Sequence, residues 1–167
     1  MNKYMEIAKE NADKGIAKKE GGPFGAVIVD KKGNIIANGN NKVLKNNDPT
    51  AHAEVVAIRE ACKKLNTYDL SDYILYTSCE PCPMCLSAII WANIKKVYYG
   101  CTKEDAGDIG FRDDIIYDYL KGKNKDLIHL TLIDRDECIK TFEKYNDIDN
   151  KVYDEAKQFI KEVFDIK

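Results

Sequence analysis

Apolar residues recur along the chain with two different spacings. Between residues 2 and 19 they lie three or four positions apart, which predicts an amphipathic helix that ends at the break Gly21-Gly22-Pro23. Elsewhere, short apolar runs bounded by polar segments predict strands. We expect five strands, at 24–30, 35–40, 73–77, 96–100 and 127–133.

Helices are expected between and after these strands. The spacing predicts them at 51–65, 83–93 and 113–121, with residues 101–110 as a loop and a charged helical tail over 135–167 that is broken near 146–150. Strands that alternate with helices predict an α/β fold whose central sheet is covered on both faces. The length of 167 residues suits a single domain over 1–167.

Composition narrows the functional class. The chain has 26 Lys and Arg against 28 Asp and Glu and a pI near 5.8, so the fold-wide basic surface of many nucleic-acid-binding proteins is absent. Apolar runs such as Ala88–Ala92 are far too short to span a membrane, and the first residues lack the apolar segment of a secretory signal. Six cysteines in such a chain do not predict a disulfide framework. We therefore expect a cytoplasmic protein without a membrane or nucleic-acid partner.

Residues 50–85 contain side chains that bind metals, at an informative spacing. His52 and Glu54 are followed, about one helix and one strand later, by a Pro-Cys-Pro-Met-Cys segment that ends at Cys85. Cys82 is expected to be the N-cap of the helix that follows, with proline as the first helical residue, so that both sulfurs reach one ion. Thr50 is expected to cap the helix over 51–65, so that its tip points at the same site.

One imidazole and two thiolates make three protein ligands for zinc and leave a fourth position open, as in catalytic zinc sites. Glu54 is then a carboxylate beside the metal that can move protons. Two other interpretations are open. Cys82 and Cys85 could form a redox pair, which leaves His52 and Glu54 without a purpose, or Cys79 could be the fourth ligand of a closed structural site.

The H-x-E … P-C-x-x-C pattern resembles the signature of the zinc-dependent nucleobase deaminases. Three longer segments, Gly21–Val29, Asn47–Val55 and Leu75–Leu86, are similar to cytidine-deaminase-like zinc hydrolases, and within them to bacterial guanine deaminases. The segments GGPFGAVIV and YTSCEPCPMC favour guanine deaminase over the tRNA adenosine editors, whose loop usually reads TLEPCxMC. The resemblance runs from about residue 3 to about residue 120. It implies a three-layer α/β/α fold with a central mixed sheet of about five strands.

The resemblance also implies a reaction. His52, Cys82 and Cys85 would bind one zinc ion per subunit, and Glu54 would shuttle protons. The expected chemistry is hydrolytic deamination of a free nucleobase, most simply guanine to xanthine and ammonia through attack at C2. The alternatives are a tRNA adenosine-to-inosine deaminase, a deaminase of another amino-heterocycle such as cytosine, and a zinc-stabilised binding module without chemistry.

Two further residues match substrate-binding positions of the family. Asn41 matches an asparagine that hydrogen-bonds the purine edge, and an amide offers both a donor and an acceptor. Phe24 matches an aromatic residue that packs on the base, and an aromatic face suits a planar heterocycle. Asn41 could instead stabilise a turn, and Phe24 could belong to the core.

The chain departs from the family pattern after the dipeptide Gly110-Phe111. Arg112 stands where the family has an acidic residue, so Asp113 becomes the candidate that binds the exocyclic amine and the ring N–H. This departure leaves the choice of base open, and Asp114 could simply cap a helix.

The tail carries a further expectation from the resemblance. In bacterial guanine deaminases a C-terminal segment closes the site and is exchanged between two subunits, so the resemblance implies a homodimer with residues 135–167 as a lid or swapped segment. Candidate lid residues are Glu143, Tyr145 and Tyr153.

Overall fold

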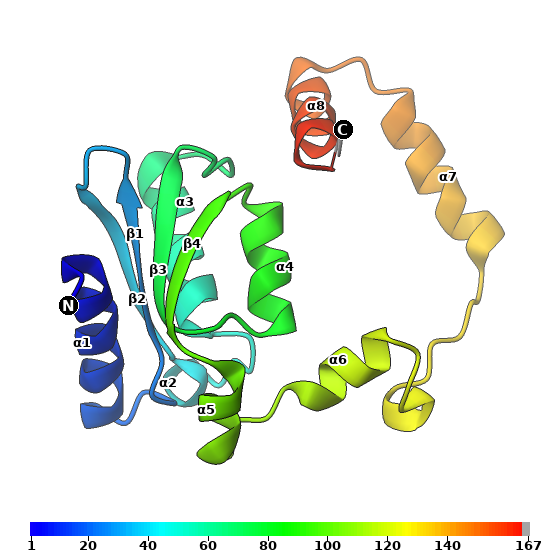
Figure 1. Cartoon of the computed structure of the whole chain (residues 1–167). Helices are drawn as coiled ribbons and strands as arrows, with labels where there is room; N and C mark the ends of the chain where they lie inside the picture. The colour runs from blue at the N-terminus through cyan, green and yellow to red at the C-terminus, as the bar shows by residue number, and fades with distance from the viewer. Residues whose placement is uncertain (165–167) are drawn as a thin grey trace. The chain divides into compact units, whose positions relative to one another are not determined.

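The computed structural model describes residues 1–164, and the chain divides into two compact units, one from Met1 to Tyr117 and one that starts at Asp118. The first unit holds a four-stranded sheet in the order β2-β1-β3-β4 (Figure 1). Its strands are β1 (Gly25–Asp30), β2 (Ile35–Asn40), β3 (Tyr73–Cys79) and β4 (Lys96–Cys101). β1 is antiparallel to both of its neighbours, whereas β3 and β4 are parallel, so the sheet is mixed.

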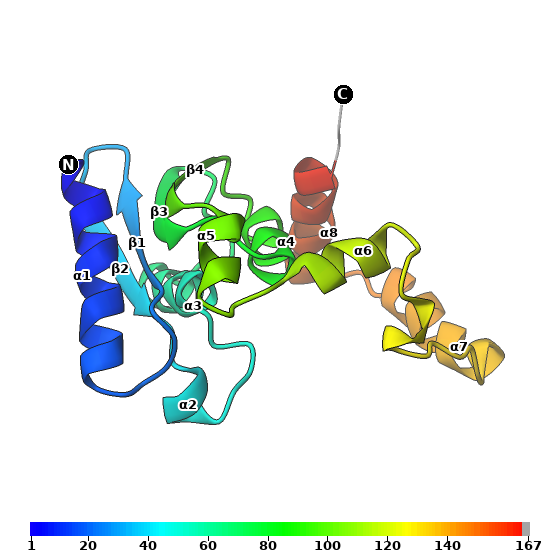
Figure 2. The same cartoon turned by 60° about the horizontal axis from the view of Figure 1, so that its bottom comes forward.

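Helices cover both faces of this sheet (Figure 2). The covering helices are α1 (Lys3–Ala17), α3 (Ala53–Leu65) and α4 (Pro83–Trp91). The chain also forms the shorter helices α2 (Val43–Asn46), α5 (Lys103–Asp108) and α6 (Asp114–Leu120). On one face, Ala8 of α1 packs with Val27 and its neighbours on β1 and β3. On the other face, Ala57 of α3 and Ile89 of α4 pack with Leu75 of β3. The expected three-layer α/β/α fold is confirmed.

Helix α3 lies very close to strand β2 at Gly39. A Cβ atom at Gly39 would lie 2.2 Å from the carbonyl oxygen of Ala53 and 2.8 Å from the amide nitrogen of Ala57. Both atoms belong to the helix backbone, which cannot rotate away as a side chain can. The missing side chain therefore fixes the distance of the first turn of α3, which carries Glu54, from the sheet.

We expect the substitution Gly39→Ala to destabilise the protein by about 1–3 kcal/mol, because overpacking forces the backbone of α3 to shift. Urea denaturation of the wild type and the variant measures this change. Gly107→Ala is the matched control, since Gly107 lies within α5 and a Cβ there would meet no atom closer than 4.0 Å. The control should be neutral or slightly stabilising. Equal stability of the Gly39 variant and the control would contradict the close approach.

The prediction of about five strands is wrong by one. The expected strand at 127–133 pairs with no strand among the described residues, and Leu130 and Leu132 are about 80% exposed. A 3₁₀ turn at Lys125–Leu127 precedes this segment, whose Ile128 has extended dihedral angles. The apolar residues of this segment suit a strand, but a strand also needs a hydrogen-bonded neighbour, which local pattern does not supply.

Two short helices replace expected loops. Residues 101–110 were expected to be a loop, but α5 forms there because Thr102 and Asp105 make a reciprocal capping box. Helix α2 follows Lys42 in a segment with no helical apolar spacing, and it has no side-chain cap. Such single-turn helices depend on contacts with the rest of the fold.

The second unit is helical, as the tail pattern predicts. It contains α7 (Arg135–Asn146) and α8 (Lys151–Phe164), and the last positions of the predicted tail, 165–167, lie outside the described residues. The rings of Tyr145 and Tyr153 pack edge to face at 5.1 Å between centroids, and Lys157 Nζ lies 4.6 Å from the centroid of the Tyr145 ring. Within residues 1–164, no helix has both the length and the apolar composition needed to cross a bilayer.

Candidate active site

The cysteine pair lies where strand β3 gives way to helix α4. Cys82 is the N-cap of α4 in an extended conformation and Pro83 is the first helical residue, as the sequence predicts. The side chain of Cys82 makes no capping hydrogen bond, so its sulfur is not held at the helix end. Cys85 lies one turn further along α4 and is buried. Both sulfurs therefore face the same point beside the helix start.

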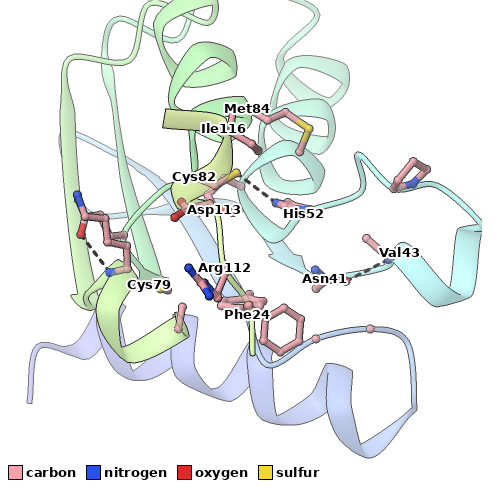
Figure 3. Close-up of a pocket in the computed structure, with 18 of the residues that line it drawn as sticks. Phe24, Asn41, Val43, His52, Cys79, Cys82, Met84, Arg112, Asp113 and Ile116 are labelled. Carbon is pink, nitrogen blue, oxygen red and sulfur yellow. Dashed lines mark hydrogen bonds between the residues drawn. The ribbon is translucent and has the colours of Figure 1, made fainter. Parts of the chain in front are cut away.

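His52, and not Thr50, is the N-cap of helix α3. The prediction of Thr50 was wrong because its hydroxyl donates a hydrogen bond to Asp48 Oδ1 (2.7 Å), within a tight turn that also includes a bond from the Ala51 amide to the Asp48 carbonyl. The helix can begin only after this turn. The side chain of His52 makes no capping hydrogen bond either, which leaves its ring directed at the cysteines (Figure 3).

The three predicted metal ligands form one cluster. His52 Nδ1 lies 3.5 Å from the sulfur of Cys82 and 3.5 Å from the sulfur of Cys85, and the three ligand atoms lie within 4.8 Å of one another. In a tetrahedral site with Zn–S near 2.3 Å and Zn–N near 2.1 Å, a sulfur and a nitrogen ligand are about 3.6 Å apart. The donor set and its spacing therefore fit zinc.

The two cysteines of the cluster differ in how easily they lose a proton. The pKa of Cys82 is lowered to about 4, because the Cys85 thiol and the His52 ring hydrogen-bond its sulfur. The pKa of Cys85 is raised, since the thiolate of Cys82 lies beside it and the site is buried. Cys82 also raises the pKa of His52 through the hydrogen bond between them. Zinc would favour the thiolate form of both cysteines, because thiolates are among its preferred ligands.

Glu54 lies beside the cluster in the first turn of α3. The residue is 5% exposed, and Thr77 Oγ1 donates a hydrogen bond of 3.2 Å to its Oε1. Burial raises the pKa of this carboxyl, with Cys82 adding to the effect. Thr77 stands on β3 beneath the helix, so the sheet orients the carboxylate. A carboxylate so placed is suited to proton transfer.

Cys79 does not belong to the cluster. Among the described residues, the group that could hold a metal contains only His52, Cys82 and Cys85. The sulfur of Cys79 instead donates to the carbonyl oxygen of Thr102 at 3.5 Å. Burial raises the pKa of Cys79 to about 12, so it stays a thiol. The arrangement does not support the closed structural site considered from the sequence.

A cavity of about 670 Å³ opens beside the cluster, and Phe24, Asn41 and Asp113 line it (Figure 3). Glu54 lines it as well. Asn41 is 5% exposed and its Oδ1 accepts a hydrogen bond from the amide of Val43 (3.1 Å). The turn role considered for Asn41 is therefore real, but it uses only the carbonyl oxygen. The amide nitrogen stays available as a donor.

The aromatic wall of this cavity has two members. Phe24 packs edge to face with Phe111, with ring centroids 5.0 Å apart. Phe24 also packs against the core, so the core role considered from the sequence holds as well. Sequence reasoning treated Phe111 only as part of a dipeptide. Its exposure of 46% in an aromatic residue beside the cavity is the structural reason to include it.

Arg112 is held in an ion pair with Asp114, whereas Asp113 is not part of that pair. The guanidinium of Arg112 donates to both carboxylate oxygens of Asp114, from Nε at 3.0 Å and from Nη2 at 2.6 Å. Asp113 makes no such pair, and burial raises the pKa of its carboxyl. The unexpected arginine is thus paired with Asp114, two positions further along the chain, which also begins α6. Asp113 lines the cavity together with the carboxylates of Glu54 and Glu80.

Sequence reasoning missed Thr77, which orients Glu54. A threonine in a strand otherwise rich in apolar residues gives no signal of its own, since threonine is common in strands. The candidate lid residues Glu143, Tyr145 and Tyr153 lie in the second unit. Their role stays a prediction.

Residues 1–101 match the family described as the cytidine and deoxycytidylate deaminase zinc-binding region. The chain belongs to this deaminase family. It is 57% identical over 117 residues to guanine deaminase from Bacillus subtilis, a match that covers 70% of this chain and 72% of the relative. It is 43% identical over 117 residues to tRNA-specific adenosine deaminase from Haemophilus influenzae, which covers 70% and 67%.

The solved structures of the deaminase family include a strong match. The X-ray structure of guanine deaminase from Bacillus subtilis superposes with a TM-score of 0.85 and 47% identity, over 90% of this chain and 98% of that one. The sequence match covers less of this chain than the structural match does. This agrees with the expectation that the resemblance in sequence fades near residue 120.

Proposed function

We propose that this chain is a zinc-dependent aminohydrolase that converts free guanine to xanthine and ammonia. The observation that carries the proposal is that a zinc-compatible cluster and a buried carboxylate, Glu54, border one cavity that is also lined by polar and aromatic side chains. The similarity to a guanine deaminase over most of the chain supports the choice of base.

One zinc ion per subunit, held by His52, Cys82 and Cys85, would supply Lewis acidity and make hydroxide available at neutral pH. Glu54 accepts a proton from the attacking water and passes it to a ring nitrogen of the base. Glu54 then takes the proton of the hydroxyl now bonded to C2 and delivers it to the amine. The C2–N bond breaks, so that guanine and water become xanthine and ammonia. Thr77 holds the carboxylate in place through both transfers.

The cavity residues recognise the base at two edges. The amide nitrogen of Asn41 donates to the acceptor edge of the purine, because its carbonyl oxygen is already bonded to Val43. Asp113 accepts from the ring N–H and the exocyclic amine, which are the donors of guanine. Phe24 and Phe111 present aromatic surface to the heterocycle.

Ammonia release by the purified, zinc-loaded protein tests the proposal. The panel consists of guanine, cytosine, adenine, isocytosine, guanosine and an adenosine-containing anticodon stem-loop. Turnover restricted to guanine supports the proposal. Turnover of another base with none on guanine keeps the zinc chemistry but overturns the assigned substrate.

A tRNA adenosine deaminase is the second candidate, favoured by the 43% identity to such an enzyme. An RNA-binding enzyme depends on contacts with phosphates, so the logarithm of its affinity falls steeply with the logarithm of salt concentration. Binding of the anticodon stem-loop at two salt concentrations distinguishes the candidates. The near-neutral composition favours weak binding without a steep slope.

We expect Asp113→Asn to lower kcat/KM for guanine by about 10- to 150-fold, because a hydrogen bond to a charged acceptor contributes about 1.5–3 kcal/mol. Asp108→Asn is the matched control, since Asp108 is exposed at the end of α5 and does not line the cavity. Initial rates of xanthine formation measure both variants. A loss in the control equal to that in Asp113→Asn would mean that the loop, and not the carboxylate, is what matters.

We also propose that the protein is a cytoplasmic homodimer with an exchanged C-terminal tail. The free state of all six cysteines supports a reducing compartment. Strongly exposed apolar residues in the second unit, such as Leu132 and Phe142, support a partner for the tail. Light scattering coupled to size-exclusion chromatography measures the mass, and a monomer that is fully active would overturn the proposal.

A further inference from the structure

Glu20 is a carboxylate that is nearly buried, at 8% exposure, between the end of α1 and the end of β2. Its Oε1 accepts from Lys45 Nζ at 2.6 Å and its Oε2 accepts from Asn40 Nδ2 at 2.8 Å. These two bonds hold the pKa of Glu20 below its ordinary value. Burying a charged group is unfavourable unless it is paired and hydrogen-bonded, so both bonds are needed to keep this carboxylate in place.

The main chain of Glu20 contacts the same neighbours. Its carbonyl oxygen accepts from the amides of Leu44 and Lys45, at 3.1 and 3.0 Å, and its own amide donates to Gly15 at 2.9 Å. Helix α2 is only four residues long and has no side-chain cap, so it cannot be stable alone. Glu20 therefore attaches α2 to the body of the first unit through backbone and side chain together.

These contacts reach Asn41 from two sides. On one side, Asn40 Nδ2 bridges Glu20 and the carbonyl oxygen of Asn41, at 3.1 Å from the latter. On the other side, the Oδ1 of Asn41 accepts from Val43, the first residue of α2. The backbone amide of Asn41 also donates to the carbonyl oxygen of Phe24 at 3.0 Å, which helps to place its main chain. The bonds to its own carbonyl oxygen and to its side-chain oxygen both come from neighbours of Glu20.

The backbone at Gly21 packs tightly against the side chain of Asn41. A Cβ atom at Gly21 would lie 2.0 Å from Asn41 Oδ1, so the backbone just after Glu20 touches the Asn41 side chain. A small movement of the turn after Glu20 would therefore move the Asn41 amide. Val43 and Leu44 line the cavity, whereas Glu20, Asn40 and Lys45 do not.

We propose that the Glu20–Asn40–Lys45 cluster positions the Asn41 amide and helix α2 for recognition of the base. Glu20 is a positioning residue, since it acts through Asn41 and does not line the cavity itself. The inference rests on the proposed function only in that Asn41 contacts the substrate. It holds for whichever amino-heterocycle the cavity accepts.

The test compares steady-state kinetics of Glu20→Gln, Lys45→Met and the double variant with the wild type. We expect KM for guanine to rise about tenfold in each variant while kcat and zinc content change less than twofold, because the metal ligands lie on other elements. The KM of the double variant should be no higher than that of either single variant, since both substitutions break the same ion pair between Glu20 and Lys45. Glu10→Gln is the matched control, because Glu10 forms an exposed ion pair with Lys14 within α1. The KM of this control should stay within twofold of the wild-type value.

A purely structural role gives a different result. It would lower the folded fraction, kcat and zinc content together and leave KM unchanged. An unchanged KM in Glu20→Gln with an active wild type, or the same rise in Glu10→Gln, would overturn the inference.

Hydrogen exchange separates this inference from the proposed function. If the wild type does not deaminate guanine, the proposed function fails. The exchange rates of the Leu44 and Lys45 amides, which donate to the Glu20 carbonyl oxygen, still measure how firmly α2 is attached. We expect these amides to exchange about tenfold faster in Glu20→Gln than in Glu10→Gln. Equal exchange in the two variants would overturn the assigned role of Glu20.

Discussion

The variant Glu54→Gln will bind zinc as the wild type does but will turn over guanine about 10²- to 10⁴-fold more slowly, the range that general acid–base catalysis contributes. Glutamine has nearly the same shape as glutamate, and its carbonyl oxygen can still accept the hydrogen bond from Thr77. It cannot accept a proton and return it. The fold and the metal site should therefore survive while both proton transfers are lost.

Zinc content by mass spectrometry and ammonia release by a coupled assay measure the two halves of this prediction. Glu60→Gln is the matched control, because it makes the same change on an exposed position of the same helix. Its activity should stay within about twofold of the wild type. A Glu54→Gln protein that retains wild-type turnover would remove Glu54 from the mechanism.

The second large effect is expected for Cys82→Ala, which should lose both zinc and activity. Three protein ligands define the cluster, and removal of one leaves a nitrogen and a single sulfur. We expect about one zinc per chain in the wild type and less than about a tenth of that in the variant, with turnover at background. Far-ultraviolet circular dichroism should remain close to that of the wild type, because the core of the sheet and helices does not involve Cys82.

Cys79→Ala is the matched control for this prediction. Cys79 lies three residues earlier and is buried, but it bonds to Thr102 and lies outside the metal-binding group. The control should keep its zinc. If Cys79→Ala lost zinc to the same degree, Cys79 would be a fourth ligand and the site would be a closed structural one. Full activity in zinc-free Cys82→Ala would rule out a role for the metal.

The parts of the site that were predictable from sequence are those set by local rules. Pro83 after Cys82 predicts a helix start, and the spacing of Cys82 and Cys85 predicts a shared face. The position of His52 was predicted by its motif, although the assigned cap residue was wrong because Asp48 forms a turn that takes the hydroxyl of Thr50. A turn of this kind depends on one side-chain bond that has no periodic signal.

The parts that were not predictable depend on contacts between distant segments. Glu20 and Lys45 are 25 positions apart, and neither belongs to a recognisable motif. The apolar segment at 127–133 reads as a strand because its residues suit one, yet pairing depends on a neighbour that the segment does not determine. Sequence pattern thus predicted the layers and the residues that cluster as candidate metal ligands, whereas the attachment of α2 needed the structure.

The uncapped starts of α3 and α4 have a consequence for how this chain could be stabilised. His52 and Cys82 occupy positions where serine or aspartate would bond to the helix amides, and neither side chain makes such a bond among the described residues. Replacing a poor cap with a good one typically adds about 1 kcal/mol. A search for heat-resistant variants of the metal-free chain would therefore favour serine or aspartate at both positions. Each gain in heat resistance there would remove one of the atoms proposed to hold the metal, so we expect selection for stability and selection for activity to oppose each other at these two helix ends.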